Sequence, residues 1–217
     1  MITSSLGTFF WLMSAYLYVF KYKTQSTPYY DILFLCIVIF FIYSINVEIM
    51  KERCGASGSV IIPTLMPWLG IFAPFMGILY LFPEWKLPFS NTFGYLIVSI
   101  TGGVNTIEKI VINKDKLALI YQSPSLLINQ FTYTNFDKEV VNYKDVFDLE
   151  DVVAVNDFKT VLLLKEVIST WIWYMLMGSI TVSTSYMMLM STECTKTVDD
   201  YLLAHATPEQ SKSPPNK

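Results

Sequence analysis

Histidine, cysteine and paired carboxylates are the side chains that most often catalyse reactions or bind metals. The single histidine, His205, lies in a polar C-terminal stretch, where we expect an exposed side chain rather than a general base. The cysteines Cys36, Cys54 and Cys194 lack the spacing of a metal site, and the sequence leaves open whether Cys54 and Cys194 pair. Phosphate-loop, dinucleotide, HExxH and GxSxG motifs are absent. We therefore predict no catalytic residue, cofactor or metal, and no enzyme.

Ionisable residues inside apolar segments are the next candidates, because burying a charge in lipid is costly and usually serves a function. Asp31, Glu48, Lys165 and Glu166 come closest, and each lies near a segment end where it can reach water. The apolar segments therefore offer few ionisable residues for a proton relay or for a carrier of charged substrates. The acidic run Tyr143–Asp157 lacks the glycine and the alternating oxygen ligands of a calcium loop, so we interpret it as a solvated face.

Long apolar stretches surround these residues and indicate an integral membrane protein. The chain is 53% hydrophobic and only 15% charged, whereas soluble domains carry about 25% charged residues. Its net charge of -3 and its single arginine, Arg53, do not suggest a nucleic-acid partner. Five stretches contain no charged side chain: Ile2–Phe20, Ile32–Val47, Cys54–Pro83, Leu87–Ile107 and Val167–Thr192.

A mainly α-helical, polytopic transmembrane bundle is the predicted fold. Residues 1–104 form the first membrane region, with full spans near 4–20, 29–50 and 60–82, and residues 161–192 form the last transmembrane helix. The segment 91–104 reaches only about 21 Å as a helix, short of a bilayer core of about 30 Å. We therefore expect four full spans, with this segment short or re-entrant. A fifth span remains open.

Charge does little to separate the two topologies. Four spans with the N-terminus outside place eight of the basic residues near span ends in the cytoplasm and three across the membrane. Five spans with the N-terminus inside give seven against four, so both arrangements satisfy the positive-inside rule. Only the four-span arrangement places Cys54 and Cys194 on the same side.

Prolines and small residues predict how the spans pack. Pro63, Pro67 and Pro74 interrupt the third span, as in a broken helix lining a pathway or, as we favour, a kinked packing helix. In the last span, Gly178 and Ser185 are seven positions apart and share a face, which we expect to contact a neighbouring helix. The aromatic run around Trp173 is expected to anchor this helix at the headgroups.

Residues 105–160 are predicted to face water as a small mixed α/β segment. Residues 110–121 resemble a β-hairpin, with two β-rich runs around the polar turn NKDK. The uncharged stretch Pro124–Phe136 is too polar for a span, and its Asn129, Gln130 and Asn135 are predicted to bind a partner protein. Residues 193–217 form a polar tail.

Three stretches resemble one protein family: Phe82–Gly103, Pro124–Phe136 and Leu163–Cys194, the last with the arrangement W-I-W-Y-x-L-x-G-x-x-x-x-S-x-S-Y. They are similar to multi-span membrane proteins of nucleocytoplasmic large DNA viruses. The resemblance implies a protein of the virion's internal membrane, derived from the host endoplasmic reticulum. It would be a minor capsid component linking that membrane to the icosahedral shell, with lipid and other capsid or membrane proteins as partners.

Two other functions stay open. One is an accessory subunit of a protist mitochondrial complex, in the inner membrane. The other is a small transporter, which is less favoured because the two halves of the chain show no repeat of short broken spans.

Overall fold

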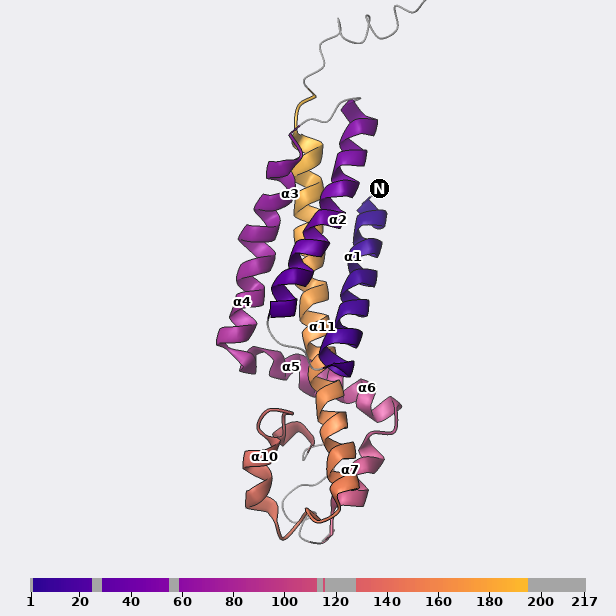
Figure 1. Ribbon diagram of the computed structural model, residues 1–217, viewed down its shortest axis with the longest axis vertical. Helices are drawn as coiled ribbons and strands as arrows, with labels where there is room; N and C mark the ends of the chain where they lie inside the picture. Colours follow the sequence, from indigo (N-terminus) through magenta and orange to yellow (C-terminus); the bar gives the residue numbers. More distant parts are fainter. Residues whose placement is uncertain (1, 25–28, 55–58, 113–114, 116–127, 195–217) are drawn as a thin grey trace, which may run out of the picture.

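The structure, a computed structural model, describes residues 2–24, 29–54, 59–112, 115 and 128–194. These residues form an elongated, mainly helical molecule with two parts along its long axis (Figure 1). The first part, which we call the bundle, contains the helices of residues 2–81 and the C-terminal half of the longest helix. The second part, the head, contains residues 104–112 and 128–166. Both parts share that longest helix.

Long apolar helices build the bundle. Helix α1 (Ile2–Tyr16) continues into the π-helical turns of η1 (Leu17–Lys23), and α2 (Tyr29–Cys54) runs beside it (Figure 1). Three helices in the described part of the chain are long and apolar enough to cross a membrane. They are Tyr29–Cys54, Ile61–Leu81 and Val152–Ser191.

The proline-rich third segment is one helix with a local change of winding. It comprises α3 (Ile61–Pro67), the π-helical η2 (Trp68–Phe72) and α4 (Ala73–Leu81). Pro74 cannot donate to the carbonyl one turn earlier, and its ring pushes that carbonyl aside. The π-helical turns directly before Pro74 are a common way to absorb this disruption. The segment is therefore wound differently at its middle and is not broken into two half-helices.

A run of short helical segments crosses the end of the bundle (Figure 1). It consists of η3 (Pro83–Lys86), α5 (Leu87–Phe89), η4 (Ser90–Gly94) and α6 (Tyr95–Ile100). We call it the transverse segment. It ends where Gly102 adopts a φ of 77°, a conformation that favours glycine, as the Gly102-Gly103 pair predicts. The segment lies across α11 rather than along it (Figure 1).

The last helix, α11, is one continuous helix from Val152 to Ser191. The side chain of Asp151 caps its start by accepting hydrogen bonds from the backbone N–H groups of Val153 and Ala154, both at 3.0 Å. The helix therefore begins nine residues before the predicted start at 161. The extra turns carry charged residues but bury Ala154 and Phe158 in the head.

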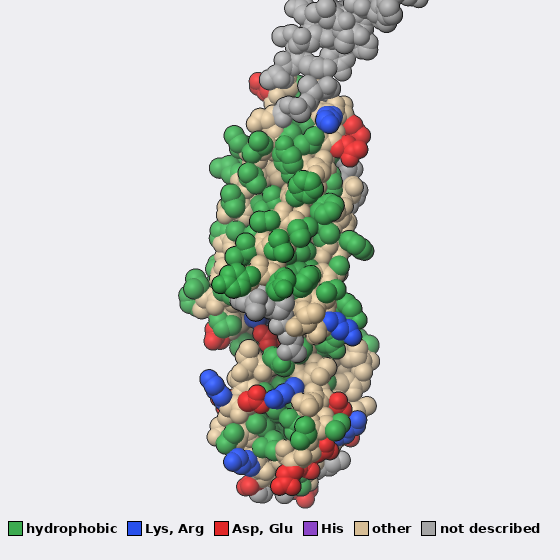
Figure 2. All heavy atoms as spheres, in the orientation of Figure 1, with side chains coloured by type: hydrophobic (Ala, Val, Ile, Leu, Met, Phe, Trp, Pro, Cys, Tyr) green, Lys and Arg blue, Asp and Glu red, His purple; other side chains and the backbone are tan. Residues whose placement is uncertain are grey.

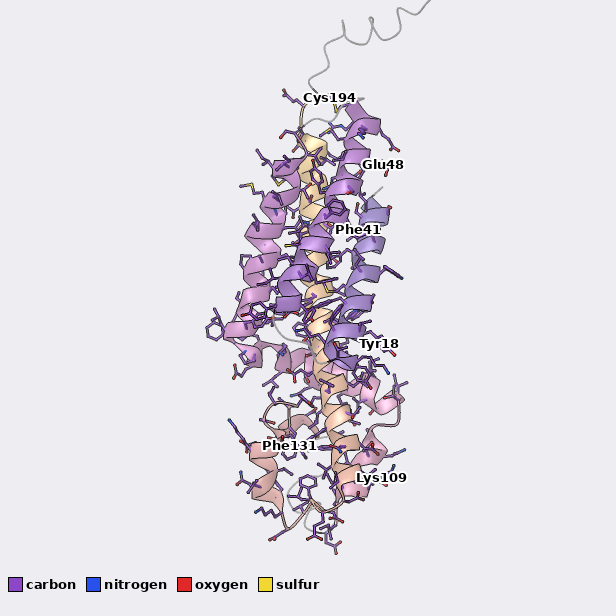
Figure 3. All side chains as sticks on the ribbon, viewed as in Figure 1. Tyr18, Phe41, Glu48, Lys109, Phe131 and Cys194 are labelled. Carbon is purple, nitrogen blue, oxygen red and sulfur yellow. A yellow bond between two sulfur atoms is a disulfide. The ribbon has the colours of Figure 1, made fainter. Side chains whose placement is uncertain are left out.

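An aromatic core holds the head together. Phe131, Phe136, Phe147 and Phe158 are almost fully buried and form edge-on or tilted ring contacts (Figure 3 labels Phe131). Around them lie α7 (Val104–Ile110), α10 (Phe136–Glu139) and the 3₁₀ turn η5 (Val140–Tyr143).

The predicted mixed α/β character of the water-facing segment is not seen in the described residues. They contain no strand, and the only β-type pairing among them is an isolated bridge between Val111 and Phe147. Most of the predicted hairpin at residues 110–121 lies outside the described residues. The head that can be described is built of short helices packed on the first turns of α11.

The surface of the bundle is apolar. Figure 2 shows hydrophobic side chains gathered over the bundle, with charged side chains over the head and at the opposite end. Ile32, Phe40, Met66 and Met187 are each more than 60% exposed although they lie within helices. Continuous exposed apolar surface of this kind is unfavourable in water and favourable in lipid. The chain is a membrane protein.

Candidate functional site

Three buried polar side chains form a hydrogen-bonded group inside the bundle. The Nδ2 atom of Asn46 in α2 donates to the hydroxyl oxygen of Thr64 in α3, at 2.8 Å, and to that of Ser185 in α11, at 3.0 Å. All three side chains are at most 2% exposed. We call this group the polar triad. It joins three helices where lipid offers no other partner, so it fixes their register.

The small residues of α11 pack helices of the same chain. Gly178 lies against the ring of Phe9 in α1, so close that a Cβ atom at this position would overlap the ring. Ser185 belongs to the polar triad. The two residues predicted to face a neighbouring helix thus contact α1 and α2, and neither is free to bind another protein.

The aromatic residues expected at the headgroups are largely internal. Trp173 and Tyr174 are buried, and the Trp173 indole N–H donates to the backbone oxygen of Phe75 at 3.2 Å. Trp173 also contacts the rings of Trp85 and Phe89 in the transverse segment. These residues attach the transverse segment and α4 to α11. Trp171, the third aromatic residue of the run, is partly exposed and its indole N–H donates to the hydroxyl of Ser14 at 3.0 Å. Anchoring of this run at the headgroups stays a prediction.

Charged residues gather at the junction between bundle and head. The Nζ atom of Lys21, at the end of η1, lies 2.8 Å from Oδ1 of Asp31, at the start of α2. The Nζ atom of Lys86 donates to Oε1 of Glu166 at 2.7 Å and ties the transverse segment to α11. The sequence shows these residues at segment ends but does not reveal the pairing.

Lys165 is the most unusual charged residue of the junction. Only 1% of it is exposed, and its Nζ atom donates to the backbone oxygen of Ile128 at 2.9 Å and to Oδ1 of Asn129 at 3.1 Å. Both partners are neutral. No carboxylate of the described residues forms an ion pair with it. A buried ammonium group without an opposite charge is costly, so this is the strongest candidate for a binding group.

Two adjoining cavities open at this junction. The smaller has a volume of about 220 Å³ and is lined by Lys86, Ser90, Lys165 and Glu166 among others. The larger has a volume of about 480 Å³ and is lined by Lys21, Asp31, Tyr80, Tyr174 and neighbours. Pro83, Lys86, Thr134 and Glu166 line both cavities, so we treat them as one cleft, the junction cleft.

The predicted partner-binding residues of the head are used in different ways. Asn129 accepts the hydrogen bond from Lys165. Asn135 closes a local turn, because its Oδ1 accepts from the backbone N–H of Thr132 at 2.7 Å. Gln130 is exposed on the head surface. Of the three, Gln130 is the most exposed, whereas Asn129 and Asn135 are partly buried.

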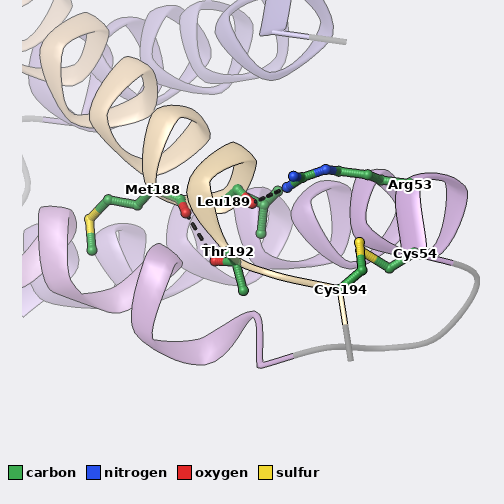
Figure 4. The surroundings of a disulfide bond; sticks show 6 residues. All are labelled: Arg53, Cys54, Met188, Leu189, Thr192 and Cys194. Carbon is green, nitrogen blue, oxygen red and sulfur yellow. Dashed lines mark hydrogen bonds between the residues drawn. A yellow bond between two sulfur atoms is a disulfide. The ribbon is translucent and has the colours of Figure 1, made fainter. Parts of the chain in front are cut away.

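A disulfide, drawn in Figure 4, closes the end of the bundle opposite the head (Figure 3 labels Cys194). It joins Cys54, the last residue of α2, to Cys194, just after α11. Beside it, the guanidinium of Arg53 donates to the backbone oxygen of Leu189 at 2.9 Å. Both contacts tie α2 to α11, and they place Cys54 and Cys194 at the same end of the molecule.

Among the described residues, no cluster of three or more His, Cys, Asp or Glu side chains is arranged to hold a metal ion. Comparisons with protein families, curated proteins and solved structures find no match for this chain. What the structure contributes to the question of function is its geometry. That geometry comprises an apolar bundle, a folded head, a disulfide at one end and a charged cleft between bundle and head.

Proposed function

We propose that this chain is a structural, non-catalytic membrane protein that holds a folded head at one face of a bilayer, where partner proteins bind it. The observation that carries the proposal is the continuity of α11. Its 40 residues pack into the head core through Phe158 and Leu162 and into the bundle core through Trp173 and Val182. A force on the head is thereby passed to the membrane part without a hinge.

Four membrane spans fit this role. The fourth is the helix formed by α1 and η1, with 15 and 7 residues. At 1.5 Å per residue its length is about 33 Å, enough to cross the apolar core. Residues 2–20 carry no charge, and the helix packs along α11 through Phe9 and Met13. Lys21 and Lys23 then end it at the junction cleft.

The orientation follows from chemistry at the two ends. Disulfides persist in oxidising compartments, so the Cys54–Cys194 end belongs on the lumenal or outer side. Most lysines near the span ends lie at the other end: Lys21, Lys86, Lys109, Lys159 and Lys165. Positive charges are retained on the cytoplasmic side. Both arguments support a head on the cytoplasmic side.

The resemblance to large DNA virus proteins suggests the setting. In a membrane derived from the endoplasmic reticulum, a cytoplasmic head would face a shell assembled in the cytoplasm, whereas the disulfide end would not. This favours a minor capsid protein that links membrane and shell. An accessory subunit of a mitochondrial complex is the alternative. Proteomics of purified virions against purified mitochondria separates the two settings.

The linking function is tested by site-specific photo-crosslinking in the native membrane or particle. A crosslinking residue at Gln130 should give one reproducible protein adduct, because this side chain is exposed on the head. A crosslinking residue at Met187, exposed on the bundle and facing lipid, is the matched control and should give none. Identical products at both positions, or none from Gln130 and from Lys109 elsewhere on the head, would contradict a partner-binding head.

A further inference from the structure

We propose that the junction cleft binds the phosphate group of a membrane phospholipid, with Lys165 and Lys86 as its main ligands. The proposal depends on the membrane placement above but not on the identity of any protein partner. The cleft lies at one end of the apolar helices. Leu79 and Tyr80 at the end of α4, Lys21 at the end of η1 and Asp31 at the start of α2 all line it. The apolar helices therefore end at the level of the cleft, where headgroups lie.

The charge of the cleft favours an anion deep inside and not at the rim. The charged residues that line it are Lys21, Lys86, Lys165, Asp31, Glu84 and Glu166. Four of these residues form two ion pairs, Lys21–Asp31 and Lys86–Glu166, and each pair is neutral overall. Lys165 is left with neutral partners, whereas Glu84 is exposed at the opening. The uncompensated positive charge is thus the buried one.

Lys165 also has a hydrogen-bond donor to spare. An ammonium group has three N–H donors, and two of them are used by Ile128 and Asn129. Lys86, Ser90 and Ser169 line the same cavity and add polar groups around it. A phosphate oxygen near Lys165 would supply the missing negative charge and accept the third hydrogen bond, both of which stabilise a buried ammonium.

The rest of the cleft suits a lipid more than a free phosphate. Leu79, Leu163 and Val167 form an apolar wall, and the rings of Tyr80, Tyr133 and Tyr174 line the same cavity. Its volume of about 480 Å³ is large for an inorganic ion and adequate for a headgroup with its glycerol. The acyl chains would continue along the exposed apolar side chains of α4, such as Leu81, which is 74% exposed.

Native mass spectrometry of the full chain released from mixed micelles tests the proposal. Phosphatidylglycerol should be retained as a one-to-one adduct, and diacylglycerol, which lacks the phosphate, should not. Lys165→Met should reduce retention about tenfold, the scale of one charge-assisted hydrogen bond. Lys165→Arg should restore most of it. Lys159→Met, on the same helix but paired with the exposed Asp137 outside the cleft, is the control and should leave retention unchanged.

Several outcomes would overturn the site. One is equal retention of diacylglycerol and phosphatidylglycerol, and another is an equal loss of retention in Lys165→Met and Lys159→Met. A third is complete displacement of the lipid by millimolar inorganic phosphate, which would assign the site to the free ion. If Lys165→Met fails to fold, Lys86→Met gives an independent test. It leaves Glu166 facing the phosphate, and retention should fall; unchanged retention in that variant would also overturn the site.

Discussion

The ring of Phe9 covers Gly178, so the first and last helices of the bundle approach each other at a position where only glycine fits. The contact lies in the main core of the bundle, beside Trp68 and Phe72. Close approach at small residues is how helices gain packing energy in lipid, where the hydrophobic effect between helices is absent. The contact therefore contributes to the packing of α1 against α11.

Replacing Gly178 with Leu should lower the stability of the detergent-solubilised protein by about 1–3 kcal/mol, because the new side chain displaces Phe9. The measurement is the midpoint of thermal unfolding. Gly77→Ala is the matched control, since nothing lies within 4 Å of a Cβ atom there. Phe9→Leu in the Gly178→Leu background should recover part of the loss. Equal effects at Gly178 and Gly77 would disprove the contact.

Asn46→Leu should destabilise the bundle by about 1 kcal/mol, because it removes both hydrogen bonds of the polar triad and interhelical hydrogen bonds in membranes average about 0.6 kcal/mol each. Ser44→Ala, two positions away on the exposed side and bonded only to its own helix, should change stability by less than about 0.5 kcal/mol. Unfolding in a graded series of denaturing detergent measures both. A silent Asn46→Leu would refute the triad.

Lys21→Met should cost about 2 kcal/mol, because Asp31 is only 3% exposed and would lose the ammonium group that neutralises it. Most of the loss should be recovered in Lys21→Met with Asp31→Asn, which removes the stranded charge. Lys23→Met is the control, since Lys23 is exposed and lies over the Tyr18 ring. If the double variant is no more stable than Lys21→Met, the Lys21–Asp31 ion pair does not contribute to the stability of the bundle.

The topology of the chain can be measured by labelling cysteines in sealed vesicles with a membrane-impermeant maleimide, with and without an impermeant reductant, in a Cys36→Ser background. Cys54 and Cys194 should be labelled only after reduction, and from the same side, because they form a disulfide at one end of the bundle. Lys109→Cys, in the head, should be labelled from the opposite side (Figure 3). Labelling of the two native cysteines from opposite sides would exclude the four-span arrangement.

Hydropathy predicted the membrane helices because the bundle faces lipid. The expected segment 29–50 becomes Tyr29–Cys54, and the expected segment 60–82 becomes Ile61–Leu81. Hydropathy missed the first nine residues of α11, because the charged residues Asp157 and Lys159 precede the apolar run and were expected to lie before the helix. Those turns are amphipathic, and Phe158 faces the aromatic core while the charges face water.

The candidate site was harder to predict because it is made of pairs distant in the sequence. Lys86 and Glu166 are 80 positions apart, and Asn46 and Ser185 are 139 apart. One signal was available. Asn46 is a strongly polar residue in an otherwise apolar span, and such residues usually find a partner on another helix. The sequence places Lys165 near the start of the last apolar segment, but its burial against Ile128 depends on the fold of the head.

The central place of α11 also has a consequence for how the protein is made. Helices α1, α2, α3 and the transverse segment all pack against it, and each is synthesised before it. Until α11 leaves the ribosome, three contacts cannot form: the packing of Phe9 on Gly178, the hydrogen bond from Asn46 to Ser185 and the disulfide between Cys54 and Cys194. The earlier helices can already contact one another, as Asn46 does Thr64 and Phe9 does Trp68, but their packing stays incomplete until α11 is present. Completion of the bundle core therefore depends on the insertion of α11.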